Sequence, residues 1–385
     1  MVLVCAVDKR QAKVLHGYIA GLLDASPLTR AEVVGRTAER IELRSGVSIE
    51  IRASDYRRVR GVTCLAAVVD EACFLRSEDS STPDVELWRA VRPSLVTTGG
   101  PFIAISTAYA KRALLYSLWR KHHGRDDSDT LVWVAPSTTM NPTLDAAVID
   151  EALREDPTGA RSEWLSMWRE DVEEFLSEAA LEAVTMPGRG ELPPERSRRY
   201  VAFLDPSGGS QDAFALCIAH GEDRNGQPVA VVDLVDEVRP PFNAEDAVAR
   251  FAATLGRFSL TTATADRFGG IWVAEAFQRH GVVIEQAAEP KSALYSAFLP
   301  LVTGRRVELL DRHGALVQLA SLERRVRAGG RDVVDHPPGA HDDLANVVAG
   351  ACVLAAASVG NDAAPIAANL GPPRGRLDLG EMGEL

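Results

Sequence analysis

The chain has 385 residues, of which 46% are hydrophobic, and its formal net charge is −12. A chain of this length accommodates two domains, each with a buried core. The net negative charge excludes a protein that coats nucleic acid along its whole surface, although local basic segments still allow binding. No apolar run reaches the 18 residues of a membrane span, and the first residues lack a secretory signal pattern. We therefore expect a cytoplasmic protein with no membrane partner.

The first 135 residues alternate short apolar segments with helical patterns, which is typical of a mostly parallel sheet with helices on its faces. Apolar spacing predicts a helix over residues 10–23, and Ser45-Gly46 predicts a hairpin turn. Further along, residues 143–183 are charged and helical in pattern. The strands predicted for this half cover residues 2–7, 64–69, 101–106 and 130–135.

A Pro-, Gly- and Arg-rich segment at 186–199 predicts a linker between a first domain at 1–185 and a second at 200–356. The second domain begins with three strands joined by tight hairpins and continues with β-α units, which is the order of an RNase H-like nuclease sheet. Its predicted strands are 200–205, 212–222, 228–238, 260–266 and 282–286. The tail at 357–385 is rich in Gly, Pro and Ala, and we expect it to be disordered.

Acidic residues stand at the ends of several elements of the second domain. Asp205 ends the first strand, Asp266 ends the fourth, and Asp342 and Asp343 open a helix. Carboxylates on separate elements suit a pair of hard cations such as Mg²⁺ or Mn²⁺, which must contact both oxygens of a phosphodiester displacement. Each aspartate taken singly is also a common turn or helix-cap residue.

Two further residues of the second domain have open interpretations. Asp212 is either a fourth metal ligand or the start of the second strand. Lys291 either approaches a phosphate or is a solvated lysine, and the sequence favours the solvated lysine. Gly208 and Gly209 predict a tight backbone turn after Asp205.

The first domain contains an apolar strand that ends in Asp70-Glu71. An ATPase uses such an aspartate to hold the water shell of Mg²⁺ and such a glutamate to polarise the attacking water. Arg60, just upstream, strengthens this interpretation. Ser106 and Thr107 end the next strand, where their hydroxyl groups either sense nucleotide or cap the following helix.

Together these segments resemble the large terminase subunit of tailed bacteriophages, over roughly residues 1–356. RGVTCLAAVVDEACF and ISTAY are similar to its Walker B region and coupling motif, and MNPTL and WREDVEEFLS to its passage from motor to nuclease. YVAFLDPSGGSQDAF, ADRFGG, LERRVRAGGRDVVDHPPG and HDDLANVVAGA are similar to its nuclease half. The resemblance implies metal ligands at Asp205, Asp266 and Asp342 or Asp343, and ATPase carboxylates at Asp70 and Glu71. It also implies double-stranded DNA, the portal protein and the small terminase subunit as partners, at the procapsid portal in the host cytoplasm.

One feature of that family is missing from the sequence. Terminase motors carry G-x-x-x-x-G-K-[ST], whose backbone amides and lysine neutralise the triphosphate of ATP, and this chain has no such string. VLVCAVDKRQAKVL resembles the strand and helix that follow that loop, which predicts a chain truncated at its amino terminus. We therefore expect an incomplete ATPase domain with no ATP hydrolysis by the chain alone.

These observations predict a metal-dependent endonuclease that cuts concatemeric double-stranded DNA and carries a remnant of an ATP-driven translocase. One alternative is another RNase H-like nuclease, such as a resolvase or transposase, which would leave the Asp-Glu strand unexplained. A second alternative, from a different class, is a non-catalytic prophage remnant or assembly factor.

Overall fold

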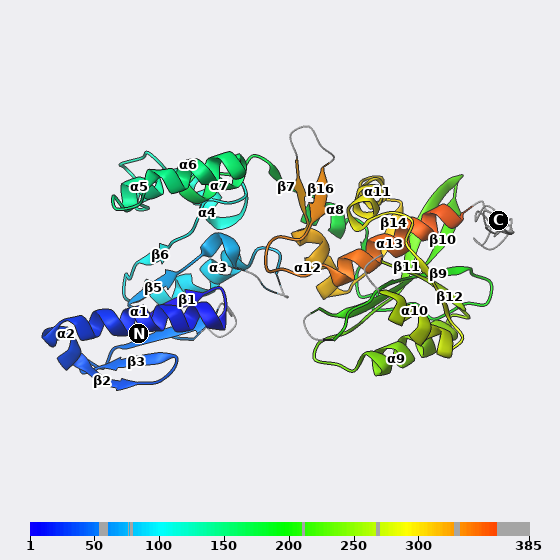
Figure 1. The fold of residues 1–385 in the computed structure, drawn as a ribbon, viewed down its shortest axis with the longest axis horizontal. Helices are drawn as coiled ribbons and strands as arrows, with labels where there is room; N and C mark the ends of the chain where they lie inside the picture. Colours follow the sequence, from blue (N-terminus) through cyan, green and yellow to red (C-terminus); the bar gives the residue numbers. More distant parts are fainter. Residues whose placement is uncertain are drawn as a thin grey trace, which may run out of the picture.

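The structure is a computed structural model that describes residues 1–53, 61–75, 77, 80–209, 212–266, 270–326 and 332–359. Arg60 lies outside the described residues, and so does the predicted disordered tail apart from its first three residues. Figure 1 shows two sheets toward opposite ends of the long axis, with β7 and β16 between them. The α/β class predicted from the sequence is confirmed.

The first sheet has six strands and is parallel through its centre. Strands β4, β1, β5 and β6 are parallel, and β2 and β3 add antiparallel hairpins at one edge. Apolar side chains of β1 and β5 pack against α3 to form its core, with Leu3, Val69 and Leu87 fully buried. The elements of this part are β1 (Val2–Ala6), α1 (Lys9–Ala25), α2 (Pro27–Glu32), β2 (Val33–Arg36), β3 (Arg40–Leu43), β4 (Ser48–Ala53), β5 (Ala66–Val69), η2 (Ala72–Phe74), α3 (Pro83–Val96) and β6 (Phe102–Ala104).

The prediction of a strand at residues 130–135 is wrong. This segment has no regular structure, and Leu131 and Trp133 are 86% and 73% exposed. An apolar alternation forms a strand only where a neighbouring strand completes its hydrogen bonds, and no described strand pairs with this segment.

The region predicted as helical at 143–183 is interrupted by a strand. It contains α6 (Ala146–Glu155), α7 (Pro157–Leu165), β7 (Val172–Glu174) and α8 (Glu178–Glu182), and it follows α4 (Ala113–His122) and α5 (Ser137–Met140). β7 joins a small antiparallel sheet with β15 (Glu323–Arg325) and β16 (Val333–Asp335). Strand pairing therefore connects the two halves of the chain.

The second sheet has seven strands in the order β13-β12-β9-β10-β11-β14-β8. Strands β9, β10 and β11 are antiparallel, while β12 is parallel to β9 and β13 is parallel to β12. This arrangement confirms the RNase H-like order predicted from the sequence. The strands are β8 (Thr185–Met186), β9 (Tyr200–Asp205), β10 (Phe214–Arg224), β11 (Gln227–Val238), β12 (Thr262–Ala265), β13 (Val283–Gln286) and β14 (Val307–Leu310).

Helices cover both faces of the second sheet. α9 (Ala244–Arg257) and α10 (Gly270–Arg279) pack on one face, where Phe214, Phe251 and Phe277 form the buried centre. α11 (Lys291–Thr303), α12 (His313–Ser321) and α13 (Asp343–Ser358) pack on the other. α13 lies across β9, β10 and β11, so its first turn reaches the edge where β9 ends (Figure 1).

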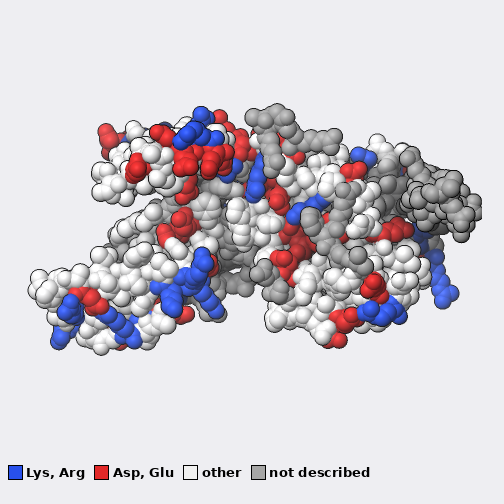
Figure 2. All heavy atoms as spheres, viewed as in Figure 1, with Lys and Arg blue, Asp and Glu red and all other residues white. Residues whose placement is uncertain are grey.

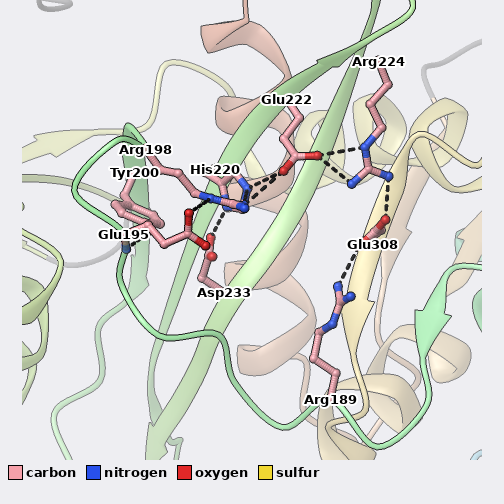
Figure 3. Close-up of polar contacts among 9 residues, drawn as sticks. All are labelled: Arg189, Glu195, Arg198, Tyr200, His220, Glu222, Arg224, Asp233 and Glu308. Atoms are coloured by element: carbon pink, nitrogen blue, oxygen red, sulfur yellow. Dashed lines mark hydrogen bonds and ion pairs between the residues drawn. The ribbon is translucent and has the colours of Figure 1, made fainter.

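Residues 186–199, predicted as a linker, lie against the second sheet. The Leu192 N–H donates to the Asp233 carbonyl at 2.7 Å, and the Arg189 guanidinium binds the Glu308 carboxylate at 2.6 Å. Figure 3 shows that Arg198 reaches a buried pair in which His220 Nδ1 lies 2.7 Å from Asp233 Oδ2. These contacts hold the segment on β10, β11 and β14.

None of the described helices is long and apolar enough to cross a membrane.

Candidate metal centre

Three elements of the second domain bring carboxylates to one edge of the sheet. Asp205 is the last residue of β9, and Asp266 directly follows β12, the parallel neighbour of β9. Parallel neighbours end at the same edge, and the Asp266 N–H donates to the Leu204 carbonyl at 3.0 Å, which continues the pairing up to the site. Asp342 precedes α13 and Asp343 begins it. The structure thus brings together the four aspartates that the sequence singled out.

Asn346 lies between two of these carboxylates. Its Nδ2 donates to Asp205 Oδ2 and to Asp266 Oδ2, each at 2.7 Å. The residue is fully buried, one turn into α13, and its Oδ1 has no hydrogen-bond partner in the described part of the chain. An amide that leaves one buried acceptor unsatisfied while binding two carboxylates indicates a strong local demand for positive charge.

The pKa values of two aspartates at the site also indicate that positive charge is favoured there. Burial raises the pKa of Asp205 to about 8; the hydrogen bond from Asn346 opposes this, and the charges of Asp343, Asp266 and Asp342 add to it in that order. Burial and the Asp342 charge raise the pKa of Asp343 to about 6. Crowded carboxylates with raised pKa values bind a divalent cation favourably, since the cation replaces their protons.

These shifts make the stability of the metal-free protein depend on pH. A carboxyl group whose folded pKa is above its unfolded value binds more protons in the folded state, so stability falls as pH rises between the two pKa values. For Asp205 that window runs from about 4 to about 8. We expect the melting temperature in EDTA to fall from pH 5.5 to pH 8.5, and to fall by several degrees less in Asp205→Asn. Parallel pH profiles of the two proteins, measured by differential scanning fluorimetry, would contradict this.

Asp342 is held by partners on α11. Tyr295 Oη donates to Asp342 Oδ2 at 2.7 Å, and Lys291 Nζ lies 2.9 Å from the same oxygen. Lys291 also lies 3.2 Å from Asp335 Oδ1. Burial disfavours its ammonium form, but the Asp342 and Asp335 charges more than offset this and raise the pKa of Lys291. The interpretation of Lys291 as a solvated lysine is therefore wrong.

The ordinary roles of aspartates at turns and helix starts are filled by other groups. Gln318 Oε1 accepts hydrogen bonds from the Leu344 and Ala345 N–H groups at 2.7 and 3.1 Å, so it caps α13 and Asp342 does not. After β9, the Ser207 hydroxyl donates to the Asp212 carbonyl at 2.6 Å, a contact that does not involve the Asp205 carboxylate. The carboxylates of Asp205 and Asp342 are thereby left for other interactions.

The glycines after Asp205 serve the fold. Gly209 has a φ of +84°, and a Cβ atom there would lie 2.5 Å from the Phe242 carbonyl oxygen, so only glycine fits. Gly208 has no neighbour within 4 Å of an added Cβ. The close approach of residue 242 therefore requires glycine at position 209, while part of the predicted turn lies outside the described residues.

A hollow of about 390 Å³ adjoins Asp343. Its walls come from both halves of the chain and include Leu75, Arg112, Gln318 and His341. His341 Nδ1 lies 3.4 Å from Asp212 Oδ1, and the Asp212 side chain is 61% exposed. Figure 2 shows acidic atoms gathered near the middle of the molecule, toward the first turn of α13.

A second group of possible ligands adjoins the first. Ligand atoms of Asp335, His336 and Asp342 lie within 4.8 Å of one another. The Lys291 ammonium already contacts two of these three residues, so a protein cation partly neutralises this group.

The Asp-Glu pair of the first domain also lies at a strand end. Asp70 Oδ2 accepts from Gln11 Nε2 at 3.0 Å. Glu71 has a φ of +50°, a left-handed conformation that is uncommon for a non-glycine residue. Burial, Asp70 and Glu163 raise the pKa of Glu71, while hydrogen bonds from Ser106 and Thr107 oppose the shift.

Ser106 and Thr107 do not cap the helix that follows them. α4 begins at Ala113, and Arg112 is the residue before it. Ser106 Oγ instead lies 3.4 Å from Glu71 Oε2 and accepts the Cys73 N–H at 3.1 Å. Of the two interpretations left open by the sequence, helix capping is wrong.

Comparison with known proteins gives structural neighbours alone. No protein-family profile matches the sequence, and no curated protein matches it. Among solved structures, the chain is similar to the HK97 bacteriophage large terminase, with 18% identity, a TM-score of 0.39, and coverage of 92% of this chain and 84% of the other. It is also similar to the large terminase of a thermophilic bacteriophage, with 9% identity, a TM-score of 0.37 and coverage of 90% and 84%.

A third neighbour covers the second half of the chain. The large terminase nuclease from thermophilic phage G20c with bound magnesium matches 46% of this chain and 95% of its own length, with 17% identity and a TM-score of 0.38. These three neighbours are phage large terminases or a terminase nuclease domain.

Sequence reasoning missed several residues of the site. Asn346 carried a usable signal, since it is a polar residue in an otherwise apolar helix, three positions after Asp343 and so on the same face. Tyr295 and Gln318 carried none, because their roles depend on how α11 and α12 pack against α13.

Proposed function

We propose that the second domain is a divalent-metal-dependent endonuclease for double-stranded DNA, and that the chain is a large terminase subunit of a tailed bacteriophage. The observation that carries this is the convergence of Asp205, Asp266 and Asp343 from three separate elements, while other groups supply the nearby turn and cap. The sequence motifs of a terminase at matching spacing support the narrower identity.

The residues present fit a hard cation. Carboxylate oxygens are the ligands that Mg²⁺ and Mn²⁺ prefer, and Asp205 and Asp266 offer them from adjacent strands. The buried Asp205 carboxyl, whose pKa is raised to about 8 mainly by burial, and the neighbouring Asp266 carboxyl lie close enough for one amide group to bind both, so a cation can find two carboxylates together. When bound, two such ions supply an activated water and stabilise the leaving oxygen of a phosphodiester.

Between the two adjacent aspartates of α13, we assign the ligand role to Asp343. Its charge acts on Asp205 more strongly than that of Asp342. Asp342 is instead engaged by Tyr295 and Lys291, which orient its carboxylate and neutralise part of its charge. Neighbouring residues on a helix point about 100° apart, so the two aspartates serve different partners. Asp212, whose charge adds to the raised pKa of Asp343, is a further candidate ligand.

A plasmid cleavage assay tests the function. Supercoiled DNA is incubated with the protein and Mg²⁺, with Mn²⁺, or with EDTA. We expect nicked and linear products with either ion and none with EDTA. Cleavage that persists in EDTA, or no cleavage with either ion at any protein concentration that binds DNA, would contradict the proposal.

For the first domain we propose that Asp70 and Glu71 are the ATPase carboxylates of a packaging motor. Ser106 and Thr107 contact Glu71, which suits a residue pair that responds to nucleotide. Because the sequence has no phosphate-binding loop, we expect no ATP hydrolysis by this chain above the background of a protein-free control. Phosphate release that depends on the protein and disappears in Glu71→Ala would contradict this expectation.

On the basis of the sequence resemblance, we also propose that the chain binds the portal protein and the small terminase subunit in the host cytoplasm. A pull-down with purified portal protein, with and without the small subunit, tests those contacts.

A further inference from the structure

We propose that Asn346 is a positioning residue that clamps Asp205 and Asp266 in the metal-free protein and must release them when a cation binds. This inference rests on the proposed metal-dependent function. It assigns to Asn346 a role opposed to that of a ligand, since the side chain competes with the ion for the two carboxylates.

The side-chain amide of Asn346 bridges the two carboxylates. Nδ2 has two hydrogens, and it lies 2.7 Å from one oxygen of each aspartate, so each hydrogen is donated to a different carboxylate. The nitrogen therefore occupies the space between the two carboxylates. A Mg²⁺ ion that contacted the same two oxygens would lie about 2.1 Å from each, and it could not share that space with the amide.

Asn346 is a buried polar residue on an apolar helix face. Asn346 has no exposed surface, and its Oδ1 lacks a partner among the described residues, which is unfavourable for a buried acceptor. α13 is otherwise apolar along its buried face, with Val347, Val348 and Ala351 beside Asn346. An apolar residue would avoid the unsatisfied acceptor but would remove the hydrogen bonds that Asn346 donates to both carboxylates. The amide is explained by its bonds to the carboxylates.

Linkage turns this arrangement into a measurable effect. A side chain that stabilises the metal-free state more than the metal-bound state weakens metal binding by the same factor. Removing the clamp should therefore lower the melting temperature in EDTA and, at the same time, tighten the binding of Mn²⁺. A ligand would have the opposite effect on affinity, and a residue with only a packing role would change neither the affinity nor the response to metal.

The experiment measures Mn²⁺ binding by isothermal titration calorimetry and thermal stability with and without metal, at pH 8.5, for wild type, Asn346→Ala and Asn346→Asp. Circular dichroism verifies that each variant is folded. We expect both variants to bind Mn²⁺ about 10-fold more tightly than wild type. In EDTA we expect both to melt about 3–6 °C lower, because a 10-fold change corresponds to about 1.4 kcal/mol and each kcal/mol shifts the melting temperature of a domain of this size by about 2–4 °C. Saturating Mn²⁺ should restore most of that loss.

Thr254→Ala is the matched control, because Thr254 is a nearly buried polar residue on α9 whose hydroxyl bonds only to the Arg250 carbonyl among its described contacts. Its melting temperature should fall equally with and without metal. If the wild type binds Mn²⁺ and both Asn346 variants bind it with the same affinity, the clamp is overturned and the metal site stays in place. Weaker Mn²⁺ binding by Asn346→Ala would have the same consequence. Absence of Mn²⁺ binding to the wild type would overturn both the clamp and the proposed function.

Discussion

Replacing Asp205 with asparagine should reduce metal-dependent cleavage of plasmid DNA by at least about 100-fold. Loss of an outer partner of a metal site already costs 10–100-fold in affinity or activity, and Asp205 is the residue on which Asn346, Asp266 and Asp343 converge. The substitution keeps the size of the side chain and removes one anionic oxygen, so it tests the charge of the site with little effect on packing.

Asp246→Asn provides the matched control for that result. Asp246 is exposed in the first turn of α9, on the face of the sheet opposite α13, and its substitution removes the same charge. We expect cleavage by this variant to remain within about twofold of wild type. Equal cleavage by wild type and Asp205→Asn, at matched protein and Mg²⁺ concentrations, would contradict the assignment of the site.

The second large effect is on the free energy of unfolding, through the ion pair between Arg112 and Glu323 that joins the two halves of the chain. Arg112→Ala should lower the free energy of unfolding by about 3 kcal/mol, because it leaves the carboxylate of Glu323 buried without its closest cation. Glu323 is fully buried on β15, with Arg112 Nη2 2.6 Å from Oε1 and the Tyr109 hydroxyl 2.8 Å from Oε2. Arg325 remains 3.7 Å away, so the loss lies at the lower end of the range for broken buried pairs.

Lys111→Ala is a control from the adjacent position. The Lys111 ammonium binds Glu170 at 2.7 Å, but that glutamate side chain is 83% exposed, and exposed pairs contribute at most about 1 kcal/mol. Urea denaturation followed by tryptophan fluorescence measures both variants. Equal midpoints for the two would contradict a special role for the contact at Glu323. Tyr109 belongs to the ISTAY segment, so this contact ties the Ser106 strand end to the hairpin that carries Asp335.

Most of the second sheet was predictable because its signals are local. The apolar runs at β9, β10 and β11 are separated by Gly-containing segments in the sequence, and each run becomes a strand with the expected neighbours. The same local information places Asp205 and Asp266 at strand ends, and the strand order brings those ends together. The meeting of these two carboxylates was therefore predictable from residues that are 61 positions apart.

Contacts that depend on helix packing were not predictable in this way. Lys291 reads as a solvated lysine in sequence, yet α11 places it against Asp342 and Asp335. The strand prediction for residues 130–135 was wrong because the segment lacks a distant partner: its apolar alternation is typical of a strand, but no described strand pairs with it. In each case the outcome depends on a partner distant in sequence, which local periodicity does not identify.

The most direct measurement is the position of the metal itself. Crystals of the protein soaked in Mn²⁺ should show an anomalous scattering peak within about 2.3 Å of carboxylate oxygens of Asp205 and Asp266, the range of oxygen ligands to such ions. The side chain of Asn346 should be displaced from both oxygens in the same crystals. A peak confined to Asp335 and His336, or no peak at the end of β9 under conditions that support cleavage, would contradict the account.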